Sequence, residues 1–297
     1  MSVAQATLAR DDVMDIAIRH ARREQGTMLL LLAPALVVVA VLLVLPLGWL
    51  VWQSFWNDGL TLEHYRRIAT DPAYWTSFTL TFRISFLVTG LALLLGYPVA
   101  YAALKLPPFW ANVVLALVVL PFWTSVLVRA YAWLILLQRT GLINEALAGL
   151  GLIDQPLELA YNELGTIIAT VHILLPFMVL PLYATMQKIP GDLVQAGASL
   201  GGTPLHVFWR VFLPLSMPGV IAGTVLVFIL CLGFYITPEL LGGGRVLMVS
   251  MIVSRNVELY AEWGAASAVA LVLLACVGLL FFAASRLISL ERILGAR

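Results

Sequence analysis

The stretch from Ile189 to Gly219 reads IPGDLVQAGASLGGTPLHVFWRVFLPLSMPG and joins two long segments without charged residues, 164–187 and 211–238. It interrupts an otherwise apolar chain with signals that start and stop helices. Pro190 can open a helix, because its missing N–H would be unpaired there. Asp192 falls in the first turn, where a carboxylate favours the helix dipole. A short helix is therefore expected to begin at Pro190.

Two glycines are expected to end this helix, and a second helix is expected to follow. Gly201 and Gly202 stand where a helix can stop. Thr203 followed by Pro204 is typical of an N-cap and a first helical residue. Pro214 is expected to disturb the new helix further along. The stretch predicts a helix, a glycine turn and another helix.

The composition around this stretch is that of a membrane protein. The chain has 297 residues, of which 62% are hydrophobic and 11% charged, and its mean hydropathy is +0.98. This is too apolar for an ordinary soluble domain. Each charge-free window can cross a hydrocarbon core, which takes about 20 helical residues. The windows are 25–57, 84–104, 106–128, 164–187, 211–238 and 263–285.

We therefore predict an all-α polytopic membrane protein with six transmembrane helices. The expected organisation is an N-terminal tail (1–27), a six-helix transmembrane domain (28–286) and a C-terminal tail (287–297), with the polar loop at 188–214. The expected spans are 28–51, 78–104, 112–137, 164–186, 217–236 and 264–285. Pro121 is expected to bend the third span, and the loop 138–163 to hold a short surface helix.

Charge distribution orients these spans. Six spans place both termini on one side of the membrane. If that side also holds the loops with Lys105, Lys188 and Arg210, it carries ten of the 17 Lys and Arg residues. The positive-inside rule then favours cytoplasmic termini and a cytoplasmic polar loop.

Several function classes are excluded by missing signals. No stretch matches the GxxxxGK[ST] phosphate loop, so the chain is not expected to bind ATP or Mg²⁺. Residues 197–201 read GASLG, which fits the hydrolase pattern GxSxG, but this pattern needs a preceding strand. The net charge of +1 gives no sign of nucleic-acid binding. Cys231 and Cys276 lie in spans and are read as apolar side chains. No catalytic or metal site is predicted.

The polar loop resembles the cytoplasmic signature loop of ABC importer permeases. That motif reads Glu-Ala-Ala, three residues, Gly, then an apolar stretch that ends in Leu-Pro. The sequence departs from it in Gln195 for Glu and Gly197 for Ala. The resemblance implies a coupling helix that docks on an ATPase subunit. The matching and flanking residues expected to carry this coupling are Asp192, Gln195, Ala196, Gly197, Leu200 and Gly201.

Further segments resemble the first permease subunit of the polyamine branch of these importers. They are PFWTSVLVRAYAW (121–133), LLPFMVLPLY (174–183) and GFYITPELLGG (233–243). The resemblance implies the type I ABC importer permease fold in the bacterial inner membrane, and a small, cationic solute such as a polyamine. It implies as partners a second permease, a cytoplasmic ATPase dimer that binds ATP and Mg²⁺, and a periplasmic solute-binding protein.

A cationic solute suggests which residues line its path. A desolvated ammonium needs carboxylates or aromatic faces. Glu239 is the best acidic candidate, and the aromatic candidates are Trp123, Tyr131, Trp133 and Tyr235. Anchoring at the membrane interface is an equal alternative for these aromatic residues. Arg129 is expected to pair with an acid such as Glu239 or to reach the outer headgroups.

Other solutes and mechanisms stay open at this point. The same importer class could carry an amino acid or a derivative of one. A secondary transporter would need coupled titratable groups near the midplane, and His172 is the one such group in these spans. A hydrogen-bonded packing role for His172 is favoured over a role in a path.

Overall fold

The computed structural model describes residues 32–56 and 59–294, and within them it shows helices and one isolated bridge between Trp56 and Leu60. Six helices in this part of the chain are long and apolar enough to cross a membrane. The first helix spans Leu32–Ser54. The others are α2 (Glu63–Thr70), α3 (Pro72–Lys105), α4 (Pro108–Val119), η1 (Leu120–Trp123), α5 (Val126–Leu137), α6 (Leu142–Gly149), α7 (Glu163–Met186), α8 (Gly191–Ser199), α9 (Pro204–Val207), η2 (Phe208–Phe212), α10 (Leu213–Leu232), α11 (Ile236–Leu241), α12 (Val249–Glu258) and α13 (Trp263–Leu294).

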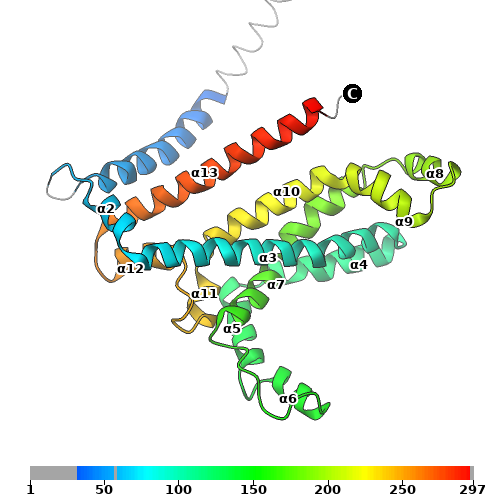
Figure 1. The fold of residues 1–297 in the computed structure, drawn as a ribbon, viewed down its shortest axis with the longest axis horizontal. Coiled ribbons are helices and arrows are strands. Elements are labelled where there is room, and N and C mark those ends of the chain that lie inside the picture. Colours follow the sequence, from blue (N-terminus) through cyan, green and yellow to red (C-terminus); the bar gives the residue numbers. More distant parts are fainter. Residues whose placement is uncertain (1–31, 57–58, 295–297) are drawn as a thin grey trace, which may run out of the picture.

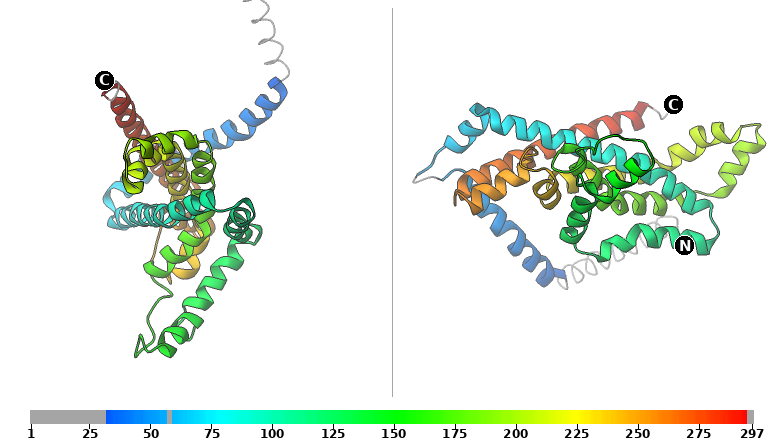
Figure 2. Two further views of the ribbon diagram at one scale, coloured as in Figure 1. Left: turned by 90° about the vertical axis from the view of Figure 1, so that its right-hand side faces the viewer. Right: turned by 90° about the horizontal axis from the view of Figure 1, so that it is seen from below.

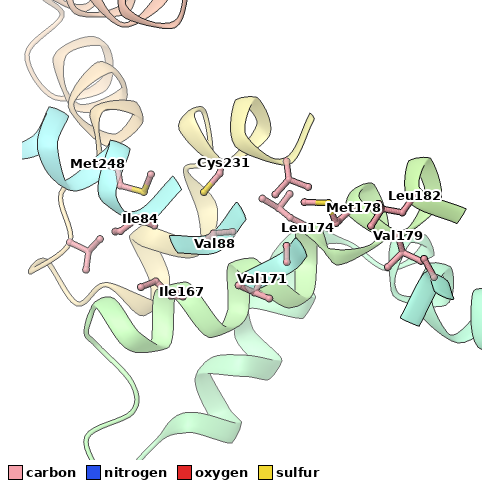
Figure 3. Close-up of a cluster of buried hydrophobic side chains, with 14 of the residues drawn as sticks. Ile84, Val88, Ile167, Val171, Leu174, Met178, Val179, Leu182, Cys231 and Met248 are labelled. Atoms are coloured by element: carbon pink, nitrogen blue, oxygen red, sulfur yellow. The ribbon is translucent and has the colours of Figure 1, made fainter. Parts of the chain in front are cut away.

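The core lies where α3, α7 and α10 pack together. Ile84 and Val88 of α3 are fully buried against α7 and α10, together with Met178 of α7 and Val227 of α10. Figure 3 shows Ile84, Val88 and Met178 between the helices, with Cys231 close by. Because lipid tails are as apolar as the side chains, such helices associate mainly by close packing.

Two glycines of α10 allow the closest approach in this core. A Cβ at Gly219 would lie 2.7 Å from Thr185 Cβ and 3.0 Å from the Pro181 carbonyl oxygen, both on α7. A Cβ at Gly223 would lie 3.2 Å from the Met178 carbonyl oxygen. Gly219 and Gly223 stand at the GxxxG spacing of close helix pairs, and only a residue without a side chain fits at this distance.

Pro214 disturbs its helix in a specific way. The span runs from Pro204 to Leu232 through a π-helical segment, η2, in which Leu213 N–H donates to the Phe208 carbonyl. A proline in a regular α-helix clashes with the carbonyl four residues earlier. The wider π turn just before Pro214 relieves that conflict. The helix therefore enters α10 without a break.

The expected third span, 112–137, differs from the structure. The chain forms α4, one 3₁₀ turn (η1) and then α5, separated by Thr124 and Ser125 in extended conformations. Pro121 lacks an N–H and cannot continue the regular hydrogen bonding. Thr124 N–H and its hydroxyl both donate to the Pro121 carbonyl instead, at 3.1 and 2.7 Å. The bend expected at Pro121 is a complete break.

Other expected boundaries shift by a few residues. The expected spans 78–104, 164–186 and 264–285 lie within α3, α7 and α13. The expected span 217–236 begins and ends earlier, as α10, because the chain leaves the helix at Gly233. The expected tail 1–27 and the start of the first span lie outside the described residues, as do the last residues of the tail 287–297; the rest of that tail continues α13 as helix.

The helices that extend beyond the core mark two opposite ends of the molecule. Figure 1 shows α8 and α9 at one end, beyond the end of α3 that leads into α4, whereas α2 and α12 lie at the other end. Both views of Figure 2 place α8 and α9 away from α6, which projects on its own. The short helix expected within 138–163 is α6. The polar loop is thus an accessible projection.

The glycine contact predicts a specific loss of stability. Gly219→Ala should lower the free energy of unfolding of the detergent-solubilised protein by about 1–3 kcal/mol, because a methyl group there overpacks against α7. The melting temperature should fall accordingly. The same change at Gly90 of α3, where nothing lies within 4 Å of the new Cβ, is the control. Gly90→Ala should be neutral or gain up to about 1 kcal/mol of helix propensity. Equal melting temperatures for the two variants would contradict the packing role.

Candidate functional site

The polar loop forms a helical hairpin whose turn is set by glycine. At the end of α8, Gly202 N–H donates to the Gly197 carbonyl and Gly201 N–H donates to the Ala198 carbonyl. This pair of bonds is the Schellman arrangement, which needs a left-handed residue after the helix. Gly201 supplies it with φ of +84°. The predicted end of the helix at Gly201 is confirmed. The left-handed backbone at this position explains why the residue is a glycine.

The second helix of the hairpin begins as the sequence predicts. Thr203 is the N-cap of α9, and its hydroxyl accepts from His206 N–H at 3.3 Å. Pro204 occupies the first turn. α8 begins at Gly191 after Pro190, with Asp192 in its first turn. Both helix starts are therefore confirmed.

Gly197 holds the two helices of the hairpin together. A Cβ at this position would lie 3.3 Å from Val207 and 3.4 Å from Val211. The Ala of the related motif would therefore press on the valines, and Gly197 lets α8 sit slightly closer. A groove of about 420 Å³ runs beside this contact. It is lined by Gly197, Leu200, Gly201, Gly202, Thr203, His206, Val207, Arg210 and Val211.

All of the coupling candidates except Gly197 are exposed on this hairpin. Asp192, Gln195 and Ala196 are exposed, and Leu200 is 90% exposed at the tip. Sequence reasoning missed Val207 and Val211. Their spacing of four residues on the second helix was the available signal.

The pathway candidates are divided among three regions. Trp123 ends η1 and is 87% exposed, and Tyr131 on α5 is 47% exposed. Tyr235 caps α11 and is half-buried, whereas Glu239 on α11 is exposed. α11 packs against α5 and α7. The structure thus brings α5 and α11 together, but Trp123 lies before the helix break and apart from that contact.

Trp133 and His172 form a polar contact between α5 and α7. The Trp133 indole Nε1–H donates to His172 Nδ1 at 3.1 Å, and the two rings meet edge to face at 5.5 Å. His172 is therefore hydrogen-bonded within the helix packing, as the favoured interpretation predicts. With Nδ1 as acceptor, the proton of a neutral imidazole is on Nε2.

Arg129 does not pair with Glu239. Arg129 is 8% exposed, and its Nε and Nη1 are enclosed without a hydrogen-bond partner. The described residues show no ion pair between Arg129 and any carboxylate. The pairing expected for Arg129 is therefore wrong for this chain alone, because Glu239 remains at the surface. The alternative, in which the side chain reaches the outer headgroups, stays a prediction.

No cluster of three or more His, Cys, Asp or Glu side chains in the described part of the chain could hold a metal ion. Cys231 is buried in the α3–α7–α10 core and Cys276 is partly buried in α13. Both lie on spans, and nothing in their surroundings gives them a chemical role. The features that stand out among the described residues are a projecting hairpin and a broken helix.

Comparison with known proteins agrees with this architecture. The spermidine/putrescine transport system permease protein PotB of Haemophilus influenzae is 36% identical over 252 residues, which cover 83% of this chain and 86% of the relative. PotB of Escherichia coli is 36% identical over 80% of this chain and 86% of its own length. The sulfate transport system permease protein CysT of Synechocystis is 30% identical over 80% of this chain and 82% of its own length.

Solved structures and a family match extend the comparison. A permease chain of a bacterial ABC transporter that imports the acidic polysaccharide alginate has a TM-score of 0.68 at 18% identity, over 91% of this chain and 99% of that chain. Residues 92–291 match the family described as binding-protein-dependent transport system inner membrane component. The chain therefore belongs to this family: it is an ABC transporter permease of the type I fold and a multi-pass protein of the inner membrane.

Proposed function

We propose that this chain forms half of the translocation pathway of an ATP-driven importer for a small cationic solute, a polyamine. The observation that supports this most is the 36% identity to PotB permeases over most of the chain. Anion-carrying relatives such as CysT are less similar, at 30% identity. An amino-acid-derived solute is the alternative within the same importer class.

The proposed importer contains four kinds of component. This chain pairs with a second permease of similar fold, and a cytoplasmic ATPase dimer binds ATP and Mg²⁺ and hydrolyses the nucleotide. A periplasmic binding protein delivers the solute. The exposed hairpin supports an ATPase contact, because Leu193, Leu200 and Leu205 are 45%, 90% and 68% exposed on it. This assignment puts both termini and the α8–α9 hairpin on the cytoplasmic side.

The hairpin suits a rigid coupling lever. Gly197 packs against Val207 and Val211, so α8 lies directly against the second helix of the hairpin. α9 continues through η2 into α10, and α8 follows α7 after four residues. A displacement of the hairpin by the ATPase would therefore act on α7 and α10 together. Coupling of this kind needs one element that both sites bias between two states.

The pathway is proposed along the α4–η1–α5 side of the chain. Trp123 and Tyr131 are exposed aromatic side chains there, and α11 brings Tyr235 and Glu239 to the far end of α5. An ammonium group can move between aromatic faces, each contributing about 0.5–2 kcal/mol. A secondary transporter is not favoured, because His172 is hydrogen-bonded to Trp133 in the packing of two helices.

A pair of substitutions at Gly201 tests the coupling lever. With φ of +84° and no atom within 4 Å of a new Cβ, the position is sensitive to backbone strain and not to volume. Gly201→Val should reduce uptake by at least about tenfold and leave ATP hydrolysis uncoupled, because a β-branched residue strains this conformation. Gly201→Asn should transport nearly normally, since Asn tolerates left-handed angles. Normal uptake by Gly201→Val, with equal amounts of protein in the membrane, would exclude the coupling role of this turn.

Two measurements together test the solute. The binding protein of this importer should gain thermal stability with polyamines and not with amino acids or their derivatives. In the assembled importer, Glu239→Gln should weaken uptake of the polyamine several-fold, because an anionic partner for the ammonium is lost. Glu258→Gln, an exposed carboxylate on α12 that accepts from Ser254, is the matched control. If amino acids alone stabilise the binding protein, the solute is an amino acid and not a polyamine.

A further inference from the structure

Arg129 is a buried cation that no carboxylate of the described residues neutralises. The side chain lies in the first turn of α5 and is 8% exposed. Nε and Nη1 are enclosed and have no hydrogen-bond partner. The third nitrogen, Nη2, is not among the enclosed atoms, so the guanidinium meets the surface there. Burying an unpaired charge costs several kcal/mol, so a partner for Arg129 is expected.

The acids of the described residues are engaged or distant. The ion pairs found there join other arginines, in Arg67–Glu262, Arg83–Glu163 and Arg139–Glu158. Glu239 on the neighbouring α11 is exposed and does not reach Arg129. No carboxylate of the described residues therefore pairs with Arg129, which directs the search for its acceptor to another molecule.

The surroundings of Arg129 offer hydrogen-bond donors. His172 is close enough to interact electrostatically with it. Because His172 Nδ1 accepts from Trp133, its remaining ring nitrogen is a donor. The N-terminus of α5 has no side-chain cap, so its first N–H groups also lack acceptors, and the helix dipole adds positive potential. A site made of donors selects an anionic acceptor.

The face of α5 beside Arg129 is open. Ser125 and Ala132 lie four residues before and three residues after Arg129, which places them on the same helix face. Both are small and exposed. Long helix side chains lean toward the N-terminus, here toward Ser125 and the helix break. An acidic side chain can therefore approach Nη2 across these two small residues.

We propose that Arg129 binds a carboxylate side chain of the second permease subunit and so ties the two halves of the importer together. This inference rests on the proposed function, because a polyamine carries donors and positive charge and cannot serve as the acceptor. An aspartate or glutamate can accept two parallel N–H bonds from the guanidinium. The bound pair is neutral where the two permeases meet.

The test separates assembly from the stability of the chain itself. Arg129→Gln should reduce co-purification of the second permease by at least about tenfold, because the facing carboxylate would be left buried and unpaired. The same variant, purified without partners, should melt at the same temperature as the unmodified chain or higher, because an unpaired buried charge has been removed. Arg139→Gln, whose partner Glu158 lies in the same chain, should co-purify normally.

Further variants identify the partner residue. Arg129→Lys keeps the charge and loses the planar fork, so it should assemble to an intermediate extent. Arg129→Glu should abolish assembly, and an Asp→Arg or Glu→Arg change in one span of the second permease should restore it. That rescue would establish a direct pair and would be independent of any solute.

Two outcomes would overturn the proposal. If Arg129→Gln lowers the melting temperature of the isolated chain, the guanidinium serves packing within this chain. If assembly is intact and uptake of a carboxylated solute alone is lost, the acceptor belongs to the solute. Neither result depends on the polyamine screen. The experiment can therefore contradict the role of Arg129 without contradicting the polyamine as solute, and the reverse.

Discussion

The close contact between α10 and α7 at Gly219 and Gly223 is the interaction on which the rest of the structure depends. Apolar side chains gain little by leaving lipid for protein, so the core is held by short-range packing that only glycine allows here. The hairpin α8–α9 connects the same two helices at one end. The contact therefore packs α7 and α10 closely together, and the proposed coupling hairpin connects them at one end.

Satisfying backbone hydrogen bonds inside the membrane explains the two irregular segments. Before Pro214 the chain widens into a π turn and stays helical, so the hairpin runs into α10 without a break. After Pro121 the helix breaks, and Thr124 donates two hydrogen bonds to the Pro121 carbonyl. Non-helical backbone at membrane depth is tolerated where protein or a water-filled cavity surrounds it. The break thus fits the wall of a pathway better than a lipid-facing surface.

Local signals in the sequence predicted local features well. Thr203, Pro204 and Gly201 define a cap, a first turn and a left-handed stop, each of which depends on neighbouring residues alone. Burial of Arg129 and the bond between Trp133 and His172 depend on α5, α7 and α11 coming together, and His172 lies 39 residues after Trp133 in the sequence. A one-dimensional pattern carries no such information. Pro121 is a similar case. A proline predicts that the helix is disturbed, but it does not tell whether the helix bends or breaks.

The charge of Arg129 also bears on how a cation could pass this chain. At 4 Å and an effective dielectric constant of 20, two like charges repel by about 4 kcal/mol. An aromatic face such as that of Trp123 or Tyr131 stabilises an ammonium group by about 0.5–2 kcal/mol. One unneutralised guanidinium at that distance would therefore cancel or exceed the stabilisation from both aromatic contacts together. An aromatic path past α5 works only if an acid neutralises Arg129, and aromatic faces then bind the solute weakly enough to release it.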